Sequence, residues 1–203
     1  MMFVVSGPSG CGKTTLIKRV LAGRRDLRFS VSHTTRPRRS GERDGREYRF
    51  VSRAVFERMI ARGRFVEWAV VHGFYYGTSR SEIAAGRGRG DLVLDVDVQG
   101  ARAIRSRFPD AVSIFVLPPR YAELRRRLVA RGLDDARTIR TRLADARREI
   151  RAYREFDYLV VNDELARAAG ELEAVVRSQR CRRSVRDRDI RPILRSFRAG
   201  RGR

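Results

Sequence analysis

The chain of 203 residues carries 46 Lys and Arg against 24 Asp and Glu, which gives a formal net charge of +22, and 42% of its residues are hydrophobic. This length and hydrophobic content suit one compact core with a smaller appended lobe. No run of about 18 apolar residues and no leader pattern is present. We therefore expect neither a membrane span nor a secretory signal, and predict a globular cytoplasmic protein.

Basic residues are spread along the whole chain rather than gathered in one patch. Residues 177–203 carry +9 of the net charge, and the other +13 is distributed over residues 1–176. Arginine supplies 44 of the 46 basic residues, which indicates a bias of composition rather than selection for a phosphate-binding surface. We expect no specific nucleic-acid partner and no membrane partner, with only nonspecific adhesion to polyanions. The two cysteines, Cys11 and Cys181, are expected to be free thiols.

A glycine-rich segment near the start of the chain, residues 7–14, matches the pattern G-x-x-x-x-G-K-[ST] of a P-loop, which binds phosphate. Residues 2–5 before it predict a short buried strand, and residues 13–21 after it predict a helix. Backbone N–H groups of such a loop surround nucleotide phosphates, while Lys13 supplies a point charge and the Thr14 hydroxyl is a ligand for Mg²⁺, together with waters and phosphates. The expected ATP-binding residues are Gly7, Pro8, Ser9, Gly10, Cys11, Gly12, Lys13, Thr14 and Thr15.

Residues 33–90 are predicted to form a small mixed lobe, after a strand at 28–32. The segment 33–45 is rich in Pro, Gly and charged residues and is expected to be a loop, because it favours neither helix nor strand. Ser52 is a candidate N-cap for a helix that ends at Gly63. The remaining predicted elements of the lobe are strands at 47–51, 65–71 and 75–79 and a short helix that begins at Ser81.

Apolar strands and amphipathic helices alternate after residue 90. The predicted strands are 92–98, 112–117 and 157–162, and the predicted helices are 99–107, 121–131, 136–153 and 165–176. The helix at 136–153 is expected to point Ile139, Leu143, Ala146 and Ile150 inward. This alternation around a phosphate loop predicts an α/β fold in which a parallel sheet is covered by helices on both faces.

Several motifs, taken together, resemble those of guanylate kinases. They follow the family's order and approximate spacing across residues 2–176 and comprise residues 7–14, Ser32-His33-Thr34-Thr35-Arg36, Phe65-Val66-Glu67-Trp68, Tyr75-Tyr76-Gly77-Thr78, Asp95-Val96-Asp97-Val98-Gln99-Gly100 and Val161-Asn162-Asp163. The resemblance implies a P-loop core, a GMP-binding lobe and a helical lid. It also implies that the γ-phosphoryl group of ATP is transferred to GMP with Mg²⁺, in purine nucleotide metabolism, with dGMP as a further expected acceptor.

The resemblance further implies a division of the chain and roles for individual residues. The core would comprise 1–32, 91–131 and 143–179, with the GMP-binding lobe at 33–90, the lid at 132–142 and a basic tail at 180–203. The expected catalytic residues are Lys13, Arg36, Arg131 and Arg142. The GMP phosphate is expected at Arg36, Arg39, Tyr48 and Tyr76, and the guanine base at Ser32, Glu67, Thr78 and Asp97.

The sequence departs from the family pattern at two places. The proline in Arg36-Pro37-Arg38-Arg39 is shifted by one position, so the second phosphate-binding arginine is either Arg38 or Arg39. The lid has Leu133-Asp134-Asp135-Ala136 in place of the usual acidic run, with its length unchanged. Alternation along a strand places Asp95 and Asp97 on one face, with one expected to serve Mg²⁺ or Arg36 and the other the substrate.

Two alternative functions stay open from the sequence: a kinase for another phosphorylated small molecule, and a non-catalytic guanylate-kinase-like interaction module. The intact phosphate loop argues against the module. His33 and His72 fit no metal or triad pattern and are interpreted as structural. The sequence leaves open whether the protein is a monomer or a homo-oligomer. Residues 180–203 are expected to be frayed or peripheral, with four apolar residues able to dock as one helical turn or to contact a partner: Ile190, Ile193, Leu194 and Phe197.

Overall fold

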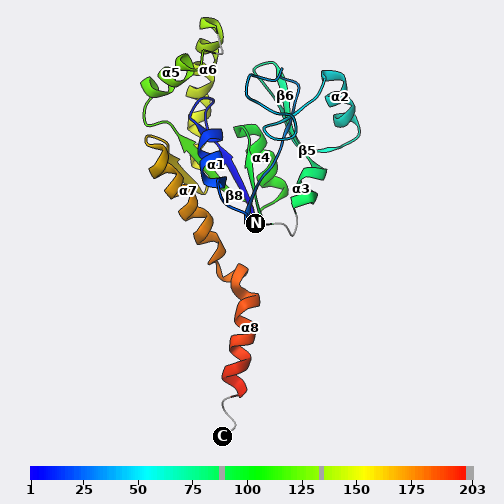
Figure 1. The fold of residues 1–203 in the computed structure, drawn as a ribbon, viewed down its shortest axis with the longest axis vertical. Helices are drawn as coiled ribbons and strands as arrows, with labels where there is room; N and C mark the ends of the chain where they lie inside the picture. The colour runs from blue at the N-terminus through cyan, green and yellow to red at the C-terminus, as the bar shows by residue number, and fades with distance from the viewer. Residues whose placement is uncertain (87–89, 133–134, 200–203) are drawn as a thin grey trace.

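A computed structural model describes residues 1–86, 90–132 and 135–199. Its elements form a core that is joined to a smaller lobe (Figure 1). The strands are β1 (Met2–Ser6), β2 (Leu27–Phe29), β3 (His33–Thr34), β4 (Arg49–Phe50), β5 (Phe65–Val71), β6 (Phe74–Ser79), β7 (Asp91–Asp95), β8 (Val112–Leu117) and β9 (Tyr158–Val161). The helices are α1 (Lys13–Leu21), α2 (Arg53–Ala61), α3 (Arg80–Gly86), α4 (Val98–Arg107), α5 (Tyr121–Ala130), α6 (Ala136–Glu149), the 3₁₀ helix η1 (Ile150–Glu155), α7 (Leu165–Arg180) and α8 (Arg183–Ala199).

Five strands of the core form a parallel sheet in the order β2-β7-β1-β8-β9. The central strand β1 pairs with β7 on one side and with β8 on the other, so that Val4 lies beside Leu94 and Ser113. Because parallel strands run in the same direction, the carboxyl ends of β1, β7 and β8 meet at one edge of the sheet. The phosphate loop and Asp95 therefore lie at the same edge, and the predicted parallel sheet is confirmed.

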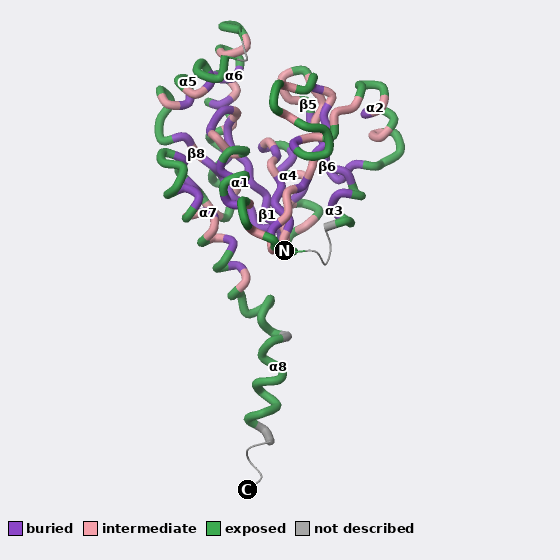
Figure 2. The backbone as a smooth tube through the Cα atoms, viewed as in Figure 1, coloured by how far each residue is buried: buried purple, intermediate pink, exposed green. Residues whose placement is uncertain are grey.

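Helices cover both faces of this sheet, as the sequence predicts. Successive side chains of β1 point to opposite faces: Phe3 and Val5 pack in a cluster with residues of α1 and α7, whereas Val4 packs in a second cluster with Ile104 of α4. These side chains are fully buried, and each contributes about 1.5–3 kcal/mol through removal of apolar surface from water. Figure 2 shows the buried residues concentrated in the strands and on the inward sides of the helices.

The smaller lobe is built on a four-stranded mixed sheet in the order β4-β3-β6-β5. The prediction of a loop over 33–45 is wrong at its start, since His33 and Thr34 form β3, which is parallel to β4 and antiparallel to β6. The buried Thr34 hydroxyl fixes this strand by donating to the carbonyl oxygen of Tyr75 at 3.0 Å. The predicted N-cap of α2 is confirmed, because the Ser52 side chain accepts from the Val55 N–H.

Two helices differ from their predicted extent. The helix expected at 136–153 is α-helical only to Glu149 and continues as η1. A 3₁₀ helix has three residues per turn, so the i, i+4 spacing no longer keeps Ile150 on the inward face, and its side chain is 39% exposed. The last predicted helix, 165–176, extends as α7 to Arg180.

Helix α8 forms where the sequence analysis expected fraying, although it is peripheral as expected. It projects from the body of the molecule along the longest axis (Figures 1 and 2). None of the described helices, α8 included, combines the length and apolar content needed to cross a bilayer. Between α7 and α8, Cys181 is exposed, whereas Cys11 is buried, and both are free thiols as predicted.

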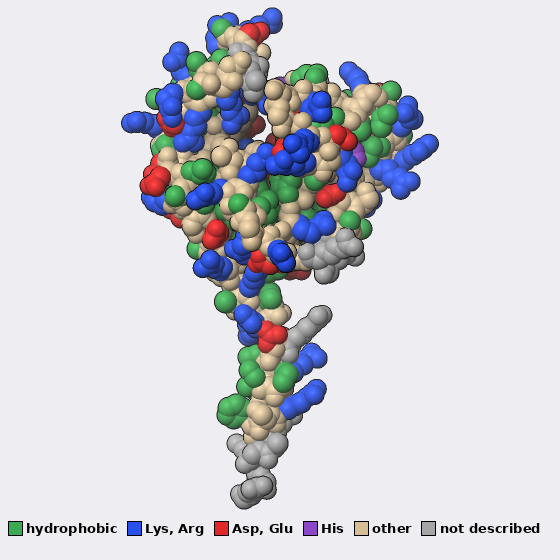
Figure 3. Space-filling model, viewed as in Figure 1, with side chains coloured by type: hydrophobic (Ala, Val, Ile, Leu, Met, Phe, Trp, Pro, Cys, Tyr) green, Lys and Arg blue, Asp and Glu red, His purple; other side chains and the backbone are tan. Residues whose placement is uncertain are grey.

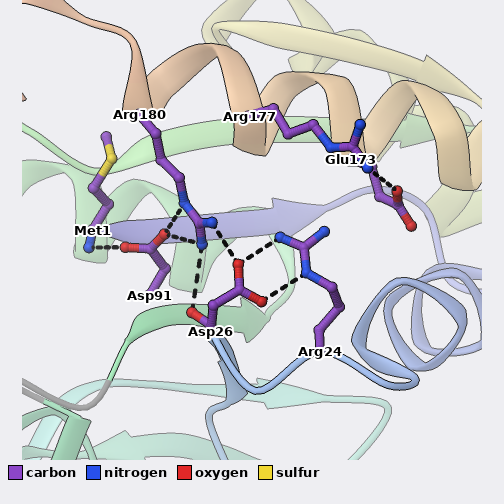
Figure 4. Close-up of polar contacts among 7 residues, drawn as sticks. All are labelled: Met1, Arg24, Asp26, Asp91, Glu173, Arg177 and Arg180. Carbon is purple, nitrogen blue, oxygen red and sulfur yellow. Dashed lines mark hydrogen bonds and ion pairs between the residues drawn. The ribbon is translucent and has the colours of Figure 1, made fainter.

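Arg180 at the end of α7 is the centre of a polar network at the amino ends of β2 and β7 (Figure 4). Its guanidinium donates twice to Asp91, at 2.8 and 2.7 Å, and also pairs with Asp26. Asp91 accepts from the Met1 ammonium, and Asp26 accepts two hydrogen bonds of 2.7 Å from Arg24. Arg24 and Arg180 hold the pKa of Asp26 well below its ordinary value. The network therefore joins the end of α7 to the sheet.

Candidate active site

A cleft of about 580 Å³ separates the phosphate loop and the α5–α6 region from the smaller lobe. Figure 3 shows the surface hollowed there, with Lys and Arg side chains at the edge. The cleft is lined by the sequence-predicted residues Gly7, Ser9, Gly10, Gly12, Lys13, Thr14, Thr15, Ser32, Arg36, Arg39, Tyr48, Glu67, Tyr76, Asp97, Arg131 and Arg142. The other three predicted residues, Pro8, Cys11 and Thr78, are buried.

The phosphate loop has a backbone conformation that depends on glycine. Gly10 and Gly12 have φ angles of 91° and 95°, in the left-handed region that other residues rarely adopt. A Cβ on Gly12 would also lie 2.4 Å from the Asn162 side chain. The loop leads directly into α1, and the Lys13 ammonium donates to the carbonyl oxygen of Gly7 at 2.5 Å. The helix N-terminus and the lysine thus present positive charge at one end of the cleft.

Two acidic residues lie near the loop, on different elements. The Thr14 hydroxyl, at the start of α1, donates to Asp95 Oδ2 at 2.6 Å, so two hard oxygen donors lie side by side. Asp97, in contrast, is the N-cap of α4 and accepts from the Gly100 N–H at 2.8 Å. The expectation that Asp95 and Asp97 share one face of a strand is wrong, because β7 ends at Asp95. Both carboxylates nevertheless line the cleft.

Glu67 is a buried carboxylate on β5 at the lobe side of the cleft. Its Oε1 accepts from the Thr78 N–H at 2.9 Å, and the Thr78 hydroxyl lies 3.4 Å from that of Ser32. Burial raises the pKa of Glu67 to about 7, and burial also raises the pKa of Asp97. The next residue on β5, Trp68, points to the opposite face and is 46% exposed.

Arginine and tyrosine side chains gather at another wall of the lobe. The guanidinium of Arg36, only 8% exposed, donates to Glu42 at 2.7 Å and lies 5.5 Å from the centre of the Tyr48 ring. Arg36 thus pairs with Glu42 rather than with Asp95. The Tyr48 ring in turn lies 5.8 Å from that of Tyr76, edge to face.

Arg39 and Arg38 differ in their position relative to the cleft. Arg39 lines the cleft and is partly buried, and its backbone N–H donates to Glu42. Arg38 is exposed. Of the two alternatives for a second phosphate-binding arginine, the geometry favours Arg39.

The opposite wall of the cleft includes Arg131, which directly follows α5, and Arg142 and Glu149 of α6. Arg131 is the C-cap of α5, and Arg142 on α6 is 9% exposed. The expected lid lies partly outside the described residues, at 133–134, and Asp135 N-caps α6 by accepting from the Thr138 N–H at 2.6 Å. Glu149, at the end of α6, accepts from the Ser9 N–H of the phosphate loop at 3.3 Å, and burial raises its pKa.

Comparison with known proteins agrees with this arrangement. The family model described as guanylate kinase matches residues 1–179. A guanylate kinase of Symbiobacterium thermophilum is 49% identical over 90% of this chain and 87% of its own length, and one of Neisseria meningitidis is 49% identical over 90% of each. The crystal structure of guanylate kinase from Anaplasma phagocytophilum superposes with a TM-score of 0.73 at 31% identity, over 90% of this chain and 87% of that one.

The chain belongs to the guanylate kinase family. In this member of the family, the carbonyl oxygen of Cys11 in the phosphate loop is fixed by Asn162, which belongs to one of the motifs that resemble the family, and by Arg127, which sequence reasoning missed. Asn162 Nδ2 donates to it at 2.8 Å and Arg127 at 3.0 Å, while Arg127 also donates to the carbonyl oxygen of Asn162 at 2.8 Å. Asn162 directly follows β9 at the carboxyl edge of the sheet. A polar residue directly after a predicted parallel strand could therefore have suggested a place near the phosphate loop.

Glu149 is a further residue that the sequence analysis missed. It lies seven positions after Arg142, on the same face of α6. This spacing from Arg142 could have indicated from the sequence that Glu149 also faces the cleft. Its contact with the loop N–H of Ser9 needed the three-dimensional structure.

Polar side-chain contacts join the smaller lobe of this guanylate kinase family member to the rest of the molecule. Lys18 of α1 lies 2.9 Å from Glu47, and His72 in the turn between β5 and β6 lies 3.4 Å from Asp145 of α6. His33, the other histidine, is buried against the Phe65 ring, and its burial lowers its pKa. The structural interpretation therefore suits His33, whereas His72 lines the cleft.

Proposed function

We propose that this chain carries out the reaction of its family, transfer of the γ-phosphoryl group of ATP to GMP, in the cleft between core and lobe. One observation carries the proposal: a phosphate loop, an Arg–Tyr cluster and the carboxylates of Glu67 and Asp97 converge on a single cleft. A non-catalytic interaction module has no need of this combination. A kinase for another small phosphorylated molecule has no need of the carboxylates of Glu67 and Asp97 at this place.

ATP is proposed to bind at the phosphate loop. The backbone N–H groups of residues 7–15 would surround its phosphates, and the Lys13 ammonium would leave the Gly7 carbonyl for a phosphate oxygen. The adjacent oxygens of Thr14 and Asp95 fit the preference of Mg²⁺ for hard ligands, with Thr14 as the direct protein ligand. Bound there, the ion would neutralise charge on the transferred group.

GMP is proposed to bind in the lobe. Guanine presents the N1–H and N2 amine as donors, which match the acceptor-only carboxylates of Glu67 and Asp97, with the hydroxyls of Ser32 and Thr78 beside them. The GMP phosphate would meet the cluster of Arg36, Arg39, Tyr48 and Tyr76, because guanidinium forks and phenol hydroxyls are good phosphate donors. None of these proposed contacts involves the ribose 2′-hydroxyl, which dGMP lacks. We therefore propose dGMP as a further acceptor.

The transfer step itself requires position and charge more than a covalent nucleophile. Arg131 and Arg142 are proposed to supply cations beside the transferring group from the α5–α6 side of the cleft. Glu149, Asn162 and Arg127 would keep the loop backbone in place through Ser9 and Cys11.

A coupled assay with ATP and each of the common nucleoside monophosphates tests this proposal. We expect turnover with GMP and dGMP and at least a thousandfold lower kcat/KM with AMP, CMP and UMP, because a base that leaves buried polar groups unpaired is strongly rejected. Lys13→Ala is the matched inactive control, and its melting temperature should stay close to that of the wild type. Equal turnover of AMP and GMP would refute the proposal, and ATP binding without any turnover would favour the interaction module.

A further inference from the structure

The turn between β5 and β6 holds an unusual backbone conformation at the cleft. His72 has a φ of 50° and is the one non-glycine residue with a positive φ in the part of the chain that the structure describes; Gly73 follows with 82°. Two successive residues of positive φ make the two-residue hairpin turn that suits the twist of the strands, in which Asn-Gly is the preferred pair. Histidine is therefore not required for the turn, and its side chain lines the cleft instead.

A face of α6 lies across the cleft from this turn. Arg142, Asp145 and Glu149 are spaced i, i+3 and i+7 and so share one side of the helix. Arg142 and Glu149 line the cleft, and Asp145 Oδ2, between them, lies 3.4 Å from His72 Nδ1. The side chains of His72 and Asp145 are 18% and 23% exposed, so water and salt screen the contact only in part.

We infer that His72 and Asp145 are positioning residues, whose contact holds the GMP-binding lobe against α6 and thereby helps to retain bound GMP in the cleft. The inference rests on the proposed function. The same strand, β5, carries Glu67 and leads into His72, while the same helix carries Arg142 and Asp145. A contact between the two elements therefore couples the base site to the lid arginine.

The lobe is also attached to the rest of the molecule away from α6: Arg28 of β2 pairs with Glu82 at 3.8 Å, and Lys18 of α1 pairs with Glu47 at 2.9 Å. That pair joins the lobe to α1, close to the phosphate loop, whereas the His72–Asp145 pair joins it to α6. Loss of the His72–Asp145 contact would leave these other attachments in place and free the lobe only from α6. The expected defect is therefore in holding GMP, rather than in folding.

Asp145 has a second partner, Arg148, three residues along the same helix. Arg148 is 78% exposed and makes no link to the lobe through this pair. Arg148→Gln is thus a matched control, because it removes one partner of Asp145 and leaves the contact with His72.

Steady-state kinetics on His72→Asn, Asp145→Asn, the double variant and Arg148→Gln test the inference. Asparagine suits the left-handed turn, so His72→Asn removes the imidazole without strain. We expect each of the first two to raise KM for GMP about two- to fivefold, the effect of a partly exposed polar side-chain contact, with kcat changed less than about twofold. The KM for GMP of the double variant should equal that of the single variants, and the KM of Arg148→Gln should equal that of wild type. Asp145→Glu keeps the carboxylate, so its KM should lie close to the wild-type value. An unchanged KM in both single variants, or additive effects in the double one, would overturn the inference.

A spectroscopic measurement separates this inference from the proposed function. The chain has two histidines, so His72→Asn assigns both imidazole signals in an NMR spectrum. The His72 signal should shift in Asp145→Asn and stay in place in Arg148→Gln. If wild type fails to phosphorylate GMP while this shift is seen, the proposed function fails and the contact stands; a His72 signal indifferent to Asp145→Asn refutes the contact. Should Asp145→Asn fail to fold, His72→Asn decides the kinetic test alone.

Discussion

Glu67 shows how a single buried carboxyl group relates stability to base selection. The Glu67 side chain is 7% exposed and accepts a hydrogen bond from the Thr78 N–H. On burial, the carboxylate loses more favourable hydration than it regains in contacts with the protein. The resulting pKa of about 7 leaves the group partly protonated at neutral pH. Guanine would supply two further donors, and would thereby favour the ionised form.

Glu67→Gln should weaken and broaden base selection. The amide can turn a donor toward the base, so we expect a loss of about 2 kcal/mol or more in kcat/KM for GMP and a smaller preference for GMP over AMP. Initial rates with the two nucleotides measure both effects. Full GMP activity with unchanged selectivity in the variant would contradict the role given to Glu67.

The same substitution should affect stability in a pH-dependent way. The folded pKa of about 7 exceeds the ordinary 4.5, so between these values the folded protein binds more protons than the unfolded chain, and the free energy of unfolding falls as pH rises. This loss of unfolding free energy levels off above pH 7 at up to about 3 kcal/mol. Without nucleotide, we expect Glu67→Gln to raise the melting temperature relative to wild type at pH 8 and not at pH 5. A difference that is the same at both pH values would show that titration of Glu67 is not its cause.

At the scale of elements, α6 is the helix on which turnover should depend most. It carries Arg142 into the cleft and ends at Glu149, which contacts the phosphate loop. A cation that meets charge as it develops stabilises the transition state more than the bound substrates. We therefore expect changes on the cleft-facing side of α6 to act mainly on turnover.

Arg142→Met should lower kcat by about 10²- to 10³-fold and change KM for ATP and GMP much less, since methionine preserves much of the side-chain length and loses the charge. Full kinetic curves against both substrates provide the measurement. A raised KM with an intact kcat would assign Arg142 to substrate binding instead.

Elements with strong local signals could be predicted from the sequence with their correct bounds. The helix at 13–21 and the strand at 112–117 match α1 and β8, because a glycine loop begins one and Pro118 ends the other. The predictions were wrong where contacts with residues distant in the sequence determine the local structure. β3 exists through pairing with β4 and β6, and Asp97 became a helix cap because β7 ended two residues earlier.

The candidate site divides in the same way. Most of the predicted residues line one cleft, since motifs concentrate the residues that touch ligands. The supporting residues were harder to find: Arg127 and Glu149 contact loop atoms more than 100 positions away in the chain. No periodicity or spacing in the sequence encodes contacts of that range.

At the scale of the whole molecule, α7 and α8 differ in how they relate to the core. α7 is fixed by its buried Leu172 and Val176 and by the Arg180 network. α8 exposes Ile193 at 52% and Phe197 at 74%, and Figure 3 shows hydrophobic side chains on one side of it and arginines on the other. We therefore expect the part of the chain needed for activity to end with α7.

Truncation after Arg182 should leave GMP kinase activity near that of wild type and weaken retention on heparin, because it removes a net charge of +6 without reaching the cleft. Truncation after Gln179 also removes Arg180 and should lower the melting temperature by about 2–5 °C more. Activity assays and thermal melts of the two shortened chains provide the comparison. Loss of activity in the longer of the two would place α8 within the catalytic unit.

Trp68 gives the molecule a built-in optical reporter. It is the chain's one tryptophan, it lies beside Glu67 on β5, and its half-exposed indole is 5.8 Å from the Tyr75 ring. Intrinsic emission excited at the red edge of the indole band therefore comes from the lobe alone, with no background from the core. Addition of GMP and of ATP to unlabelled protein can then be followed separately, with the emission reporting what each nucleotide does to the lobe.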